Sequence, residues 1–368
     1  MKTLVIVVAV VVLLVTGCSK SQRNNLVNKE REIKGNVRLA APSQGAYTGA
    51  YVDFGDYEDD VTLEAIEEFE ELVGKKQALI ASSSYWGRNV FPKKNLEIIA
   101  AYGAVPLVFW NPWDRDEWSE KKYNRFNLYS ILKGEHDTYI DMWADGAKAH
   151  GKPILLAWGI EMNGNWFPWS GIFHGGGKLV ANSNPAKYEG PKNFIRTYKY
   201  IVDRFRARGV SNVEWVFHAN NTSDPYEPWW NNMANYYPGS DYVDWLAMSA
   251  YGQQYPNVGW IEFKQSFHPF YEELLKIDSS KPVILGEWGV GHFPESGSQA
   301  KWIGEAIDRF SSSEFPRLKG AIYWHERWQN GDESYSNLRL TADDTTVEVY
   351  KDKVANPFWV ARPEFQAR

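Results

Sequence analysis

Residues 153–163 read PILLAWGIEMN, an apolar run that ends in a glutamate and an amide. A run without alternation of polar and apolar positions is typical of a strand buried on both faces of a parallel sheet. The residues directly beyond it, 164–169, read GNWFPW and combine turn-forming residues with three aromatic rings. This segment therefore predicts a buried strand that opens into a loop, with the carboxylate of Glu161 at the junction.

Seven further apolar runs occur along the chain, and amphipathic stretches separate them. The first such stretch, 61–76, carries apolar residues at helical spacing and is predicted to end at Gly74; 193–209 and 297–313 follow the same pattern. Alternating strands and helices predict an α/β protein with a single (β/α)8 TIM barrel. An open doubly wound sheet is the alternative, but no glycine-rich phosphate-binding motif follows the first strand. The eight runs lie at residues 47–55, 78–86, 104–113, 153–163, 212–221, 243–252, 282–290 and 320–327.

The composition favours a carbohydrate ligand and disfavours a nucleic-acid partner. The 368 residues carry a formal net charge of −6, and the basic residues are scattered, so no basic face is available for phosphates. Phe, Trp and Tyr make up 15% of the chain, including 18 Trp. Many of these rings stand beside Asn, Asp, Gly and Pro, in loop-like segments such as FWNPWDRDEW and DPYEPWWNN. Flat rings beside short polar groups suit a sugar, which has apolar faces and hydroxylated edges.

The N-terminus is predicted to be a targeting segment. Lys2 precedes an apolar run, and LVTGC at 14–18 resembles a bacterial lipobox, in which the cysteine becomes the lipidated first residue of the mature protein. We therefore expect a signal peptide at 1–18, lipidation of Cys18, a polar tether at 19–44 and a catalytic domain at 45–368. The protein is expected to be exported and lipid-anchored to the cell envelope; an ordinary signal peptide or a membrane anchor with an incidental cysteine is the alternative. Cys18 is the sole cysteine, which excludes an internal disulfide.

Two glutamates are predicted to lie at the same end of the barrel. Active sites of such barrels form at the carboxyl ends of the strands, where Glu161 ends the fourth predicted strand and Glu287 the seventh. A lone glutamate in such a place is more often part of a structural ion pair. Two carboxylates across a sugar-sized cleft, however, are the minimal machinery of a glycosidase, with one as acid/base and one as nucleophile.

Four segments also resemble glycoside hydrolase family 26. They read GIEMNGNWFPW (159–169), NVEWVFHANN (212–221), YYPGSDYVDWLAMSAYG (236–252) and VILGEWG (283–289), and the resemblance spans most of residues 45–330. It implies that Glu161 is the acid/base and Glu287 the nucleophile of a retaining enzyme that attacks a β-linked polysaccharide internally. The resemblance also implies that Tyr251 hydrogen-bonds the nucleophile.

Other strand-end residues are predicted to bind substrate, with a packing role as the alternative for each. Trp324 would form the platform under the sugar at the cleavage point. Trp166 and Trp169 would stack on neighbouring sugars, and Asn163 would hydrogen-bond a hydroxyl group. Trp110 and Trp113 would line a more distant subsite, and His218 is either a substrate contact or a core histidine.

One departure from the family bears on the substrate. Mannan-cleaving members typically carry a histidine directly before the acid/base and an arginine three residues before that histidine. Here Ile160 and Ala157 occupy these positions, which favours mixed-linkage β-1,3-1,4-glucan (lichenase type); an endo-β-1,4-mannanase is the alternative, followed by a β-1,3-xylanase. A non-catalytic surface glycan-binding lipoprotein remains the alternative of another class.

The histidines show no metal-ligand spacing, so neither a metal nor a cofactor is predicted. We also expect a monomer.

Overall fold

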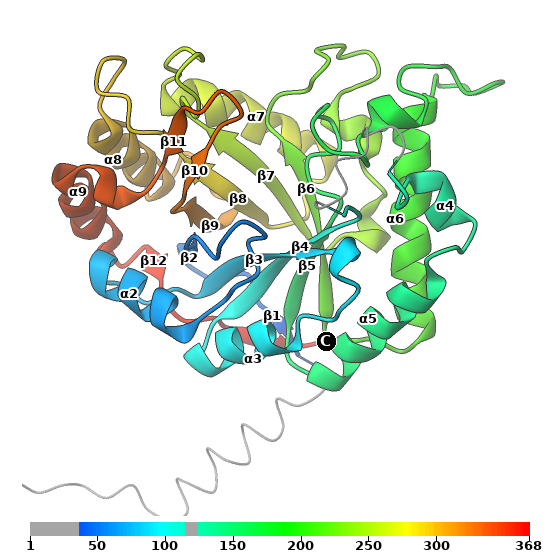
Figure 1. Cartoon of the computed structure of the whole chain (residues 1–368), viewed down its shortest axis with the longest axis horizontal. Helices are drawn as coiled ribbons and strands as arrows, with labels where there is room; N and C mark the ends of the chain where they lie inside the picture. Colours follow the sequence, from blue (N-terminus) through cyan, green and yellow to red (C-terminus); the bar gives the residue numbers. More distant parts are fainter. Residues whose placement is uncertain (1–36, 115–123) are drawn as a thin grey trace, which may run out of the picture.

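The computed structural model describes residues 37–114 and 124–368. Within them, eight parallel strands close into a barrel, because β2 pairs with both β3 and β9 (Figure 1). The predicted (β/α)8 barrel is confirmed, and each predicted apolar run overlaps one of its strands. The strands are β2 (Ala46–Tyr51), β3 (Leu79–Tyr85), β4 (Val105–Asn111), β5 (Ile154–Trp158), β6 (Val213–Asn220), β7 (Trp245–Tyr251), β8 (Val283–Gly289) and β9 (Leu318–Trp324).

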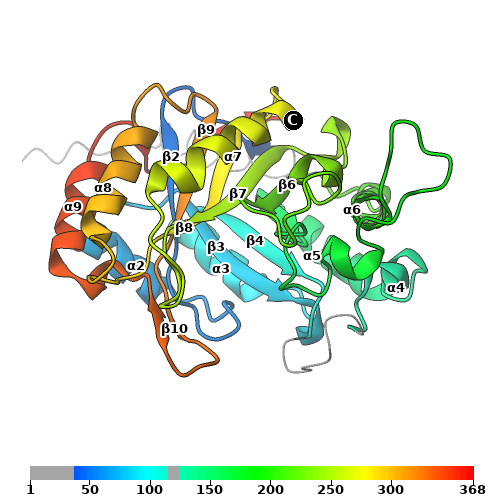
Figure 2. The same ribbon diagram turned by 90° about the horizontal axis from the view of Figure 1, so that it is seen from above.

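Helices surround the barrel as the intervening amphipathic stretches predict (Figure 2). The predicted stop of the first helix is confirmed, because Gly74 caps it with a left-handed φ of 65°. None of the helices in the described ranges is long and apolar enough to cross a bilayer. The α-helices are α2 (Leu63–Val73), α3 (Lys93–Tyr102), α4 (Leu128–Leu132), α5 (Asp137–His150), α6 (Glu189–Ala207), α7 (Phe263–Ile277), α8 (Gln299–Phe310) and α9 (Asp344–Val354).

Alternation along the strands separates two aromatic cores. On β4, Phe109 faces the barrel interior, where its ring lies 6.0 Å from that of Trp324. The next residue, Trp110, faces the helices. Its ring centroid lies 4.8 Å from that of Trp143 of α5 and 5.6 Å from that of Phe205 of α6. Successive side chains of a strand point to opposite faces, so one step in sequence decides whether a ring lies inside the barrel or under the helices.

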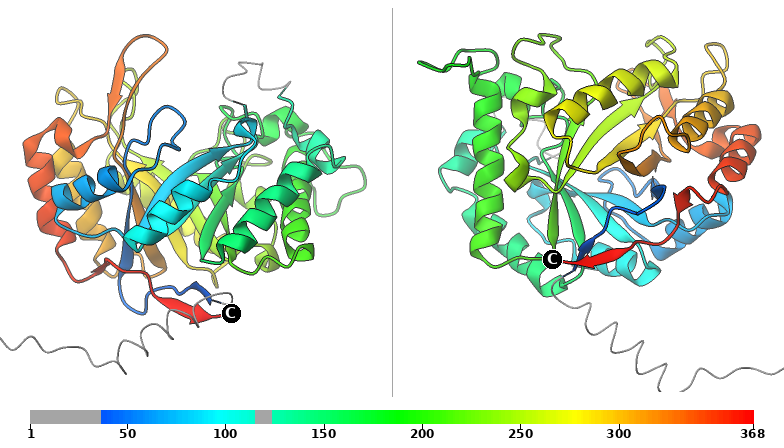
Figure 3. Two further views of the ribbon diagram at one scale, coloured as in Figure 1. Left: turned by 60° about the horizontal axis from the view of Figure 1, so that its bottom comes forward. Right: turned by 180° about the vertical axis from the view of Figure 1, so that it is seen from behind.

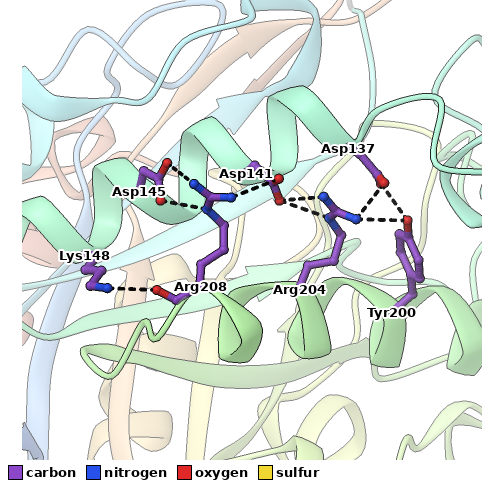
Figure 4. Close-up of polar contacts among 7 residues, drawn as sticks. All are labelled: Asp137, Asp141, Asp145, Lys148, Tyr200, Arg204 and Arg208. Atoms are coloured by element: carbon purple, nitrogen blue, oxygen red, sulfur yellow. Dashed lines mark hydrogen bonds and ion pairs between the residues drawn. The ribbon is translucent and has the colours of Figure 1, made fainter.

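Ion pairs join helices α5 and α6 along their exposed sides (Figure 4). Arg204 of α6 lies 2.6 Å from Asp137 and 2.8 Å from Asp141 of α5. One turn further, Arg208 bridges Asp141 and Asp145. Repeated pairs at helical spacing fix the register of two neighbouring helices, although each partly exposed pair adds little stability.

Both ends of the described chain meet at the bottom of the barrel. Strand β1 (Val37–Leu39) pairs antiparallel with β13 (Phe365–Ala367), and β12 (Trp359–Val360) pairs with β2 (Figure 3). The prediction that residues 19–44 form a tether is therefore wrong for residues 37–39, because a strand of three residues whose partner lies at the far end of the chain leaves no local signal. The predicted signal peptide, Cys18 and the tether up to residue 36 lie outside the described residues.

A second ribbon stands at the opposite end of the barrel. Strands β10 (Arg327–Gln329) and β11 (Tyr335–Asn337) pair antiparallel directly after β9. The ribbon projects beyond the carboxyl ends of the barrel strands, away from the β1–β13 ribbon (Figure 3). It therefore forms a wall beside the end of the barrel at which the predicted site residues lie.

Candidate active site

Glu161 lies three residues beyond the end of strand β5. The prediction had placed it on the strand, but the backbone turns at Gly159 (φ 60°) and again at Glu161 itself (φ 53°). The Glu161 amide nevertheless donates a 2.8 Å hydrogen bond to the carbonyl oxygen of His218 on β6. This bond holds the left-handed residue against the barrel, so its carboxylate stays at the carboxyl end. A non-glycine residue with positive φ is a strained conformation that often marks a functional position.

The two predicted catalytic glutamates meet at the centre of this barrel end. A carboxylate oxygen of Glu161, one of Glu287 and a ring nitrogen of His218 all lie within 4.8 Å of one another. Both glutamates are 8% exposed. Retaining glycosidases hold their two carboxyl groups about 5–5.5 Å apart, whereas inverting enzymes separate them by about 6.5–9.5 Å to admit a water molecule. The separation of Glu161 and Glu287 therefore matches the retaining geometry.

Burial and mutual proximity shift the protonation of this pair. Burial raises the pKa of Glu161, and burial together with the negative charge of Glu161 raises the pKa of Glu287 well above its ordinary value. Two carboxylates this close do not both ionise readily, so the pair titrates as a unit and tends to hold one proton. A single shared proton is the resting state that a general acid and a nucleophile require.

Three neutral donors support the ionised forms of the pair. The Tyr251 hydroxyl donates a 2.7 Å hydrogen bond to Oε2 of Glu287, as the family resemblance implied. Trp166 donates from Nε1 to Oε2 of Glu161 at 2.7 Å, and the nearby Ser249 hydroxyl also lowers the pKa of Glu161. Hydrogen bonds to a carboxylate stabilise its charged form and so oppose the effect of burial.

A cleft of about 800 Å³ opens over Glu287. Trp324 and Trp113 line it, as predicted. The ring of Trp324 stacks on Tyr51, with ring centroids 4.0 Å apart, and its Nε1 donates to Glu326 at 2.6 Å, so the indole is held in place in the cleft that Glu287 also lines. The remaining aromatic and acidic residues that line the cleft are Tyr57, Trp328, Tyr251, Asp53, Asp56, Glu58 and Glu326.

Several cleft residues were missed by the sequence analysis. Glu58 lies in the loop after β2 with a φ of 55°, and its carboxylate accepts a 2.5 Å hydrogen bond from Ser83 of β3. Its charge raises the pKa of both Glu161 and Glu287. Trp328 of β10 meets Tyr255 of the loop after β7, with ring centroids 6.2 Å apart. Trp328 was not predicted, because no local pattern indicated that β10 would fold beside the cleft.

Three predicted substrate contacts prove to be structural. Trp110 is fully buried and donates from Nε1 to the Tyr139 hydroxyl, because alternation turns it toward the helices. Trp169 is also fully buried, and its Nε1 donates to the Ile160 carbonyl at 2.6 Å. Asn163 is buried as well: its amide nitrogen donates to the Asn220 carbonyl and its Oδ1 accepts from the Asn220 amide. These predictions were wrong because each side chain is buried and hydrogen-bonds another part of the protein.

His218 is a core histidine, which settles the alternative that the sequence left open. Its side chain is 1% exposed, and Nε2 lies 2.8 Å from the Ser249 hydroxyl. Burial lowers the pKa of His218 to about 3, so the ring is neutral. Together with the two glutamates it forms a group of possible metal ligands within the described part of the chain, and this group coincides with the predicted catalytic pair.

Comparison with known proteins places this geometry in context. The model of Glycosyl hydrolase family 26 matches residues 123–271, the part that carries Glu161, His218 and Tyr251. The family model and the relatives below support the resemblance to glycoside hydrolase family 26 that the sequence motifs indicated. Endoglucanase H of Acetivibrio thermocellus is 27% identical over 317 residues, which is 81% of this chain and 31% of that protein. A mannan endo-1,4-beta-mannosidase of Bacillus subtilis is 24% identical over 249 residues, 66% of this chain and 58% of that protein.

Solved structures of family 26 share the fold. The GH26A protein of a Muricauda species superimposes with a TM-score of 0.56 at 20% identity, over 94% of this chain and 98% of that one. A modular endo-beta-1,4-mannanase from Cellulomonas fimi gives a TM-score of 0.60 at 17% identity, over 86% of this chain and 72% of that one. The likeness extends the barrel assignment over nearly the whole described chain. The curated relatives, in contrast, are longer proteins of which this chain spans less than two thirds.

Proposed function

We propose that the protein is a retaining, endo-acting β-glycoside hydrolase. The observation that carries the proposal is the pair of buried carboxylates, Glu161 and Glu287, with oxygens within 4.8 Å of each other beside an aromatic cleft. At this separation one carboxylate reaches the anomeric carbon while the other reaches the glycosidic oxygen. The family match and the relatives support the same reaction class.

The reaction takes place in two displacements. In the first, the Glu287 carboxylate attacks the anomeric carbon, and the Glu161 carboxyl group protonates the departing glycosidic oxygen. In the second, the ionised Glu161 takes a proton from water, whose oxygen attacks the anomeric carbon and releases Glu287. The Tyr251 hydroxyl orients Glu287 throughout. Trp324 supplies a flat apolar surface for the sugar ring.

Mixed-linkage β-1,3-1,4-glucan is our first choice of substrate. Mannan-cleaving members of the family place a histidine and an arginine where this chain has Ile160 and Ala157. Here both side chains are buried, at 5% and 0% exposure, and belong to the apolar core. They offer no polar contact to a sugar hydroxyl group. The loss of such contacts shifts discrimination between sugars by several kcal/mol at most.

An endo-β-1,4-mannanase is the second candidate. Among the relatives reported above, both the Bacillus subtilis protein and the Cellulomonas fimi structure bear the names of mannan-cleaving enzymes. The cleft also contains Trp113, Trp324 and Trp328, which would serve any β-linked hexose polymer. The third reading is a surface protein that captures glycans without cleaving them. Such a protein would need neither two carboxylates within 4.8 Å of each other nor the hydrogen bond from Tyr251 to Glu287.

Reducing-sugar release from five polysaccharides separates these possibilities. The purified chain from residue 19 onward is offered barley β-glucan, lichenan, galactomannan, glucomannan and β-1,3-xylan, with Glu161→Ala and Glu287→Ala as matched controls. We expect release from β-glucan and lichenan that falls by at least ~10²-fold in either variant. Release confined to the mannans would replace glucan by mannan as the substrate. Retained binding of a glycan without release would establish the capture protein instead.

The stereochemistry of the product tests the mechanism separately. A double displacement returns the β-anomer, whereas a single displacement gives the α-anomer. Proton NMR during the first minutes of hydrolysis should therefore show the β-anomer before mutarotation. An initial α-anomer would contradict the role of Glu287 as nucleophile.

We also propose that the protein is exported and anchored by a lipid on Cys18. The proposal rests on the LVTGC segment alone. An anchored endo-enzyme would act on polymer, or on its fragments, at the cell envelope.

A further inference from the structure

A buried polar chain runs behind the acid/base carboxylate and links three strands of the barrel. The Ser249 hydroxyl of β7 lies close enough to the Glu161 side chain to lower the pKa of its carboxyl group. On its other side, Ser249 Oγ lies 2.8 Å from Nε2 of His218 on β6. Ser249 is fully buried and His218 is 1% exposed, so neither meets the substrate directly. Burying polar groups costs free energy unless they are hydrogen-bonded, so the bond between Ser249 and His218 holds both side chains in defined positions.

A β-bulge creates the space for this arrangement. Along the β7–β8 pair, Met248 lies opposite Leu285 and Ser249 lies opposite Glu287, so Gly286 is the extra residue. Bulges re-aim the side chains next to them. The His218 ring packs directly on Gly286, because a Cβ at that position would lie 2.6 Å from His218 Cε1. The glycine before Glu287 therefore leaves room for an imidazole ring beside the two carboxylates.

The surroundings of the imidazole determine which nitrogen carries its hydrogen. The ring is neutral, because burial lowers its pKa. Nδ1 is buried and has no hydrogen-bond partner among the residues that the structure describes. A buried N–H without a partner is rarer in proteins than an acceptor without one. The hydrogen therefore belongs on Nε2, where it is donated to Ser249 Oγ, and the hydrogen of Ser249 is left to point at Glu161.

We propose that His218 and Ser249 are positioning residues for the acid/base. His218 fixes Ser249 as a donor, and Ser249 orients the Glu161 carboxyl group and stabilises its ionised form, which the second displacement requires. This inference rests on the proposed function. Ile160, the residue before the acid/base, has no polar group, so the polar support for Glu161 comes instead from the neighbouring strands β6 and β7.

The charges around Glu161 define what this support opposes. Burial and the negative charge of Glu58 raise the pKa of Glu161, while Ser249 and the hydrogen bond from Trp166 lower it. Removing the Ser249 donor should therefore raise the pKa of Glu161. The general acid must be protonated in the first displacement of a polysaccharide. The basic limb of the pH profile for polysaccharide hydrolysis should therefore move to higher pH. The titratable groups that lie near Glu161 or interact with its charge are Glu58, His218, Tyr251, Tyr255 and Glu287.

The two displacements can be separated with a dinitrophenyl β-oligoglucoside. Its leaving group departs without protonation, so kcat/KM reports the first displacement without the acid, and kcat reports the second displacement, which needs the base. We expect Ser249→Ala to lower kcat on the order of ten-fold, with kcat/KM changed less than about two-fold. Added azide, a nucleophile that needs no general base, should restore kcat.

Variants of His218 and a control serine complete the test. His218→Leu should act in the same direction as Ser249→Ala, and His218→Gln, which keeps a donor, should recover part of the loss. Ser266→Ala removes the hydroxyl of another buried serine, on α7, and should change neither constant. The proposal would be overturned, in favour of a purely structural role, if kcat and kcat/KM fell equally, azide had no effect, and the basic limb of the pH profile stayed in place. Wild-type protein that cleaves neither the oligoglucoside nor any polysaccharide would instead refute the proposed function.

Discussion

The Tyr251 hydroxyl and the Glu287 carboxylate lie 2.7 Å apart on neighbouring strands β7 and β8. Both side chains face the barrel interior, and Tyr251 is set opposite Gly289, two residues beyond Glu287. Burial and the negative charge of Glu161 raise the pKa of Glu287, and the Tyr251 donor counteracts both. The tyrosine is therefore the group that keeps the proposed nucleophile ionised in a site that favours its neutral form.

Tyr251→Phe should move the acidic limb of the activity profile to higher pH. The nucleophile acts when ionised, so activity is lost as the pH falls through its pKa, and removal of a donor raises that pKa further. We also expect kcat/KM at neutral pH to fall about ten-fold or more. The measurement is kcat/KM from pH 4 to 9 for both proteins. An acidic limb that stays in place would deny Tyr251 this role.

Trp166→Phe distinguishes a hydrogen-bonding role from a stacking role. Trp166 donates from Nε1 to Glu161 at 2.7 Å, and phenylalanine keeps an aromatic face but no donor. We expect the basic limb to move to higher pH and KM for β-glucan to change little. A KM that rises several-fold with an unmoved limb would show that the indole serves mainly as a sugar platform, as the sequence suggested.

Trp110 and Trp113 should respond oppositely to alanine substitution. Trp110 is fully buried between β4 and the helices, so Trp110→Ala should lower the free energy of unfolding by about 3–5 kcal/mol. Trp113 lines the cleft, so Trp113→Ala should raise KM for polysaccharide with a much smaller loss of stability. Urea denaturation and steady-state kinetics of the two variants measure this directly. A raised KM in soundly folded Trp110→Ala protein would restore the original assignment.

Glu214 should make the stability of the barrel depend on pH. Its buried carboxylate accepts hydrogen bonds from the Leu39 amide and Trp245 Nε1, and burial raises its pKa to about 7. The folded state thus binds a proton that the unfolded state releases between pH 4.5 and 7. Stability should accordingly fall over this window as the pH rises, by about 3 kcal/mol at most.

Glu214→Gln removes this titration. Urea denaturation at pH 5 and pH 8 should show a smaller loss of stability on raising the pH in the variant than in the wild type. The comparison uses the difference between the two pH values, which cancels the constant cost of replacing an acceptor by an amide. An unchanged difference would contradict the raised pKa.

Cys18→Ser tests the predicted anchor. In a bacterial host that processes lipoproteins, the wild-type chain should incorporate labelled palmitate and partition into detergent. The serine variant should do neither, because the lipid is attached through a thioether to the cysteine sulfur and serine has no sulfur. Membrane partitioning that persists in the variant would favour an uncleaved N-terminal anchor.

The sequence by itself determined the architecture and predicted that Glu161 and Glu287 would lie at the same end of the barrel. Strands buried on both faces leave continuous apolar runs, so 153–163 and its seven counterparts could be recognised one at a time. Parallel strands bring their carboxyl ends to one face, so Glu161 and Glu287 were predicted to meet without any knowledge of their contact.

Only the tertiary structure decided which neighbouring side chains serve the substrate and which serve the scaffold. Trp110 and Trp113 read alike in sequence, yet the two-residue period of β4 and the turn after it send one under the helices and the other into the cleft. Glu58, Ser249 and His218 act on Glu161 from positions 57 to 103 residues away in the chain. Such contacts depend on the closure of the barrel and on the bulge at Gly286, and neither leaves a periodic signal in the sequence around them.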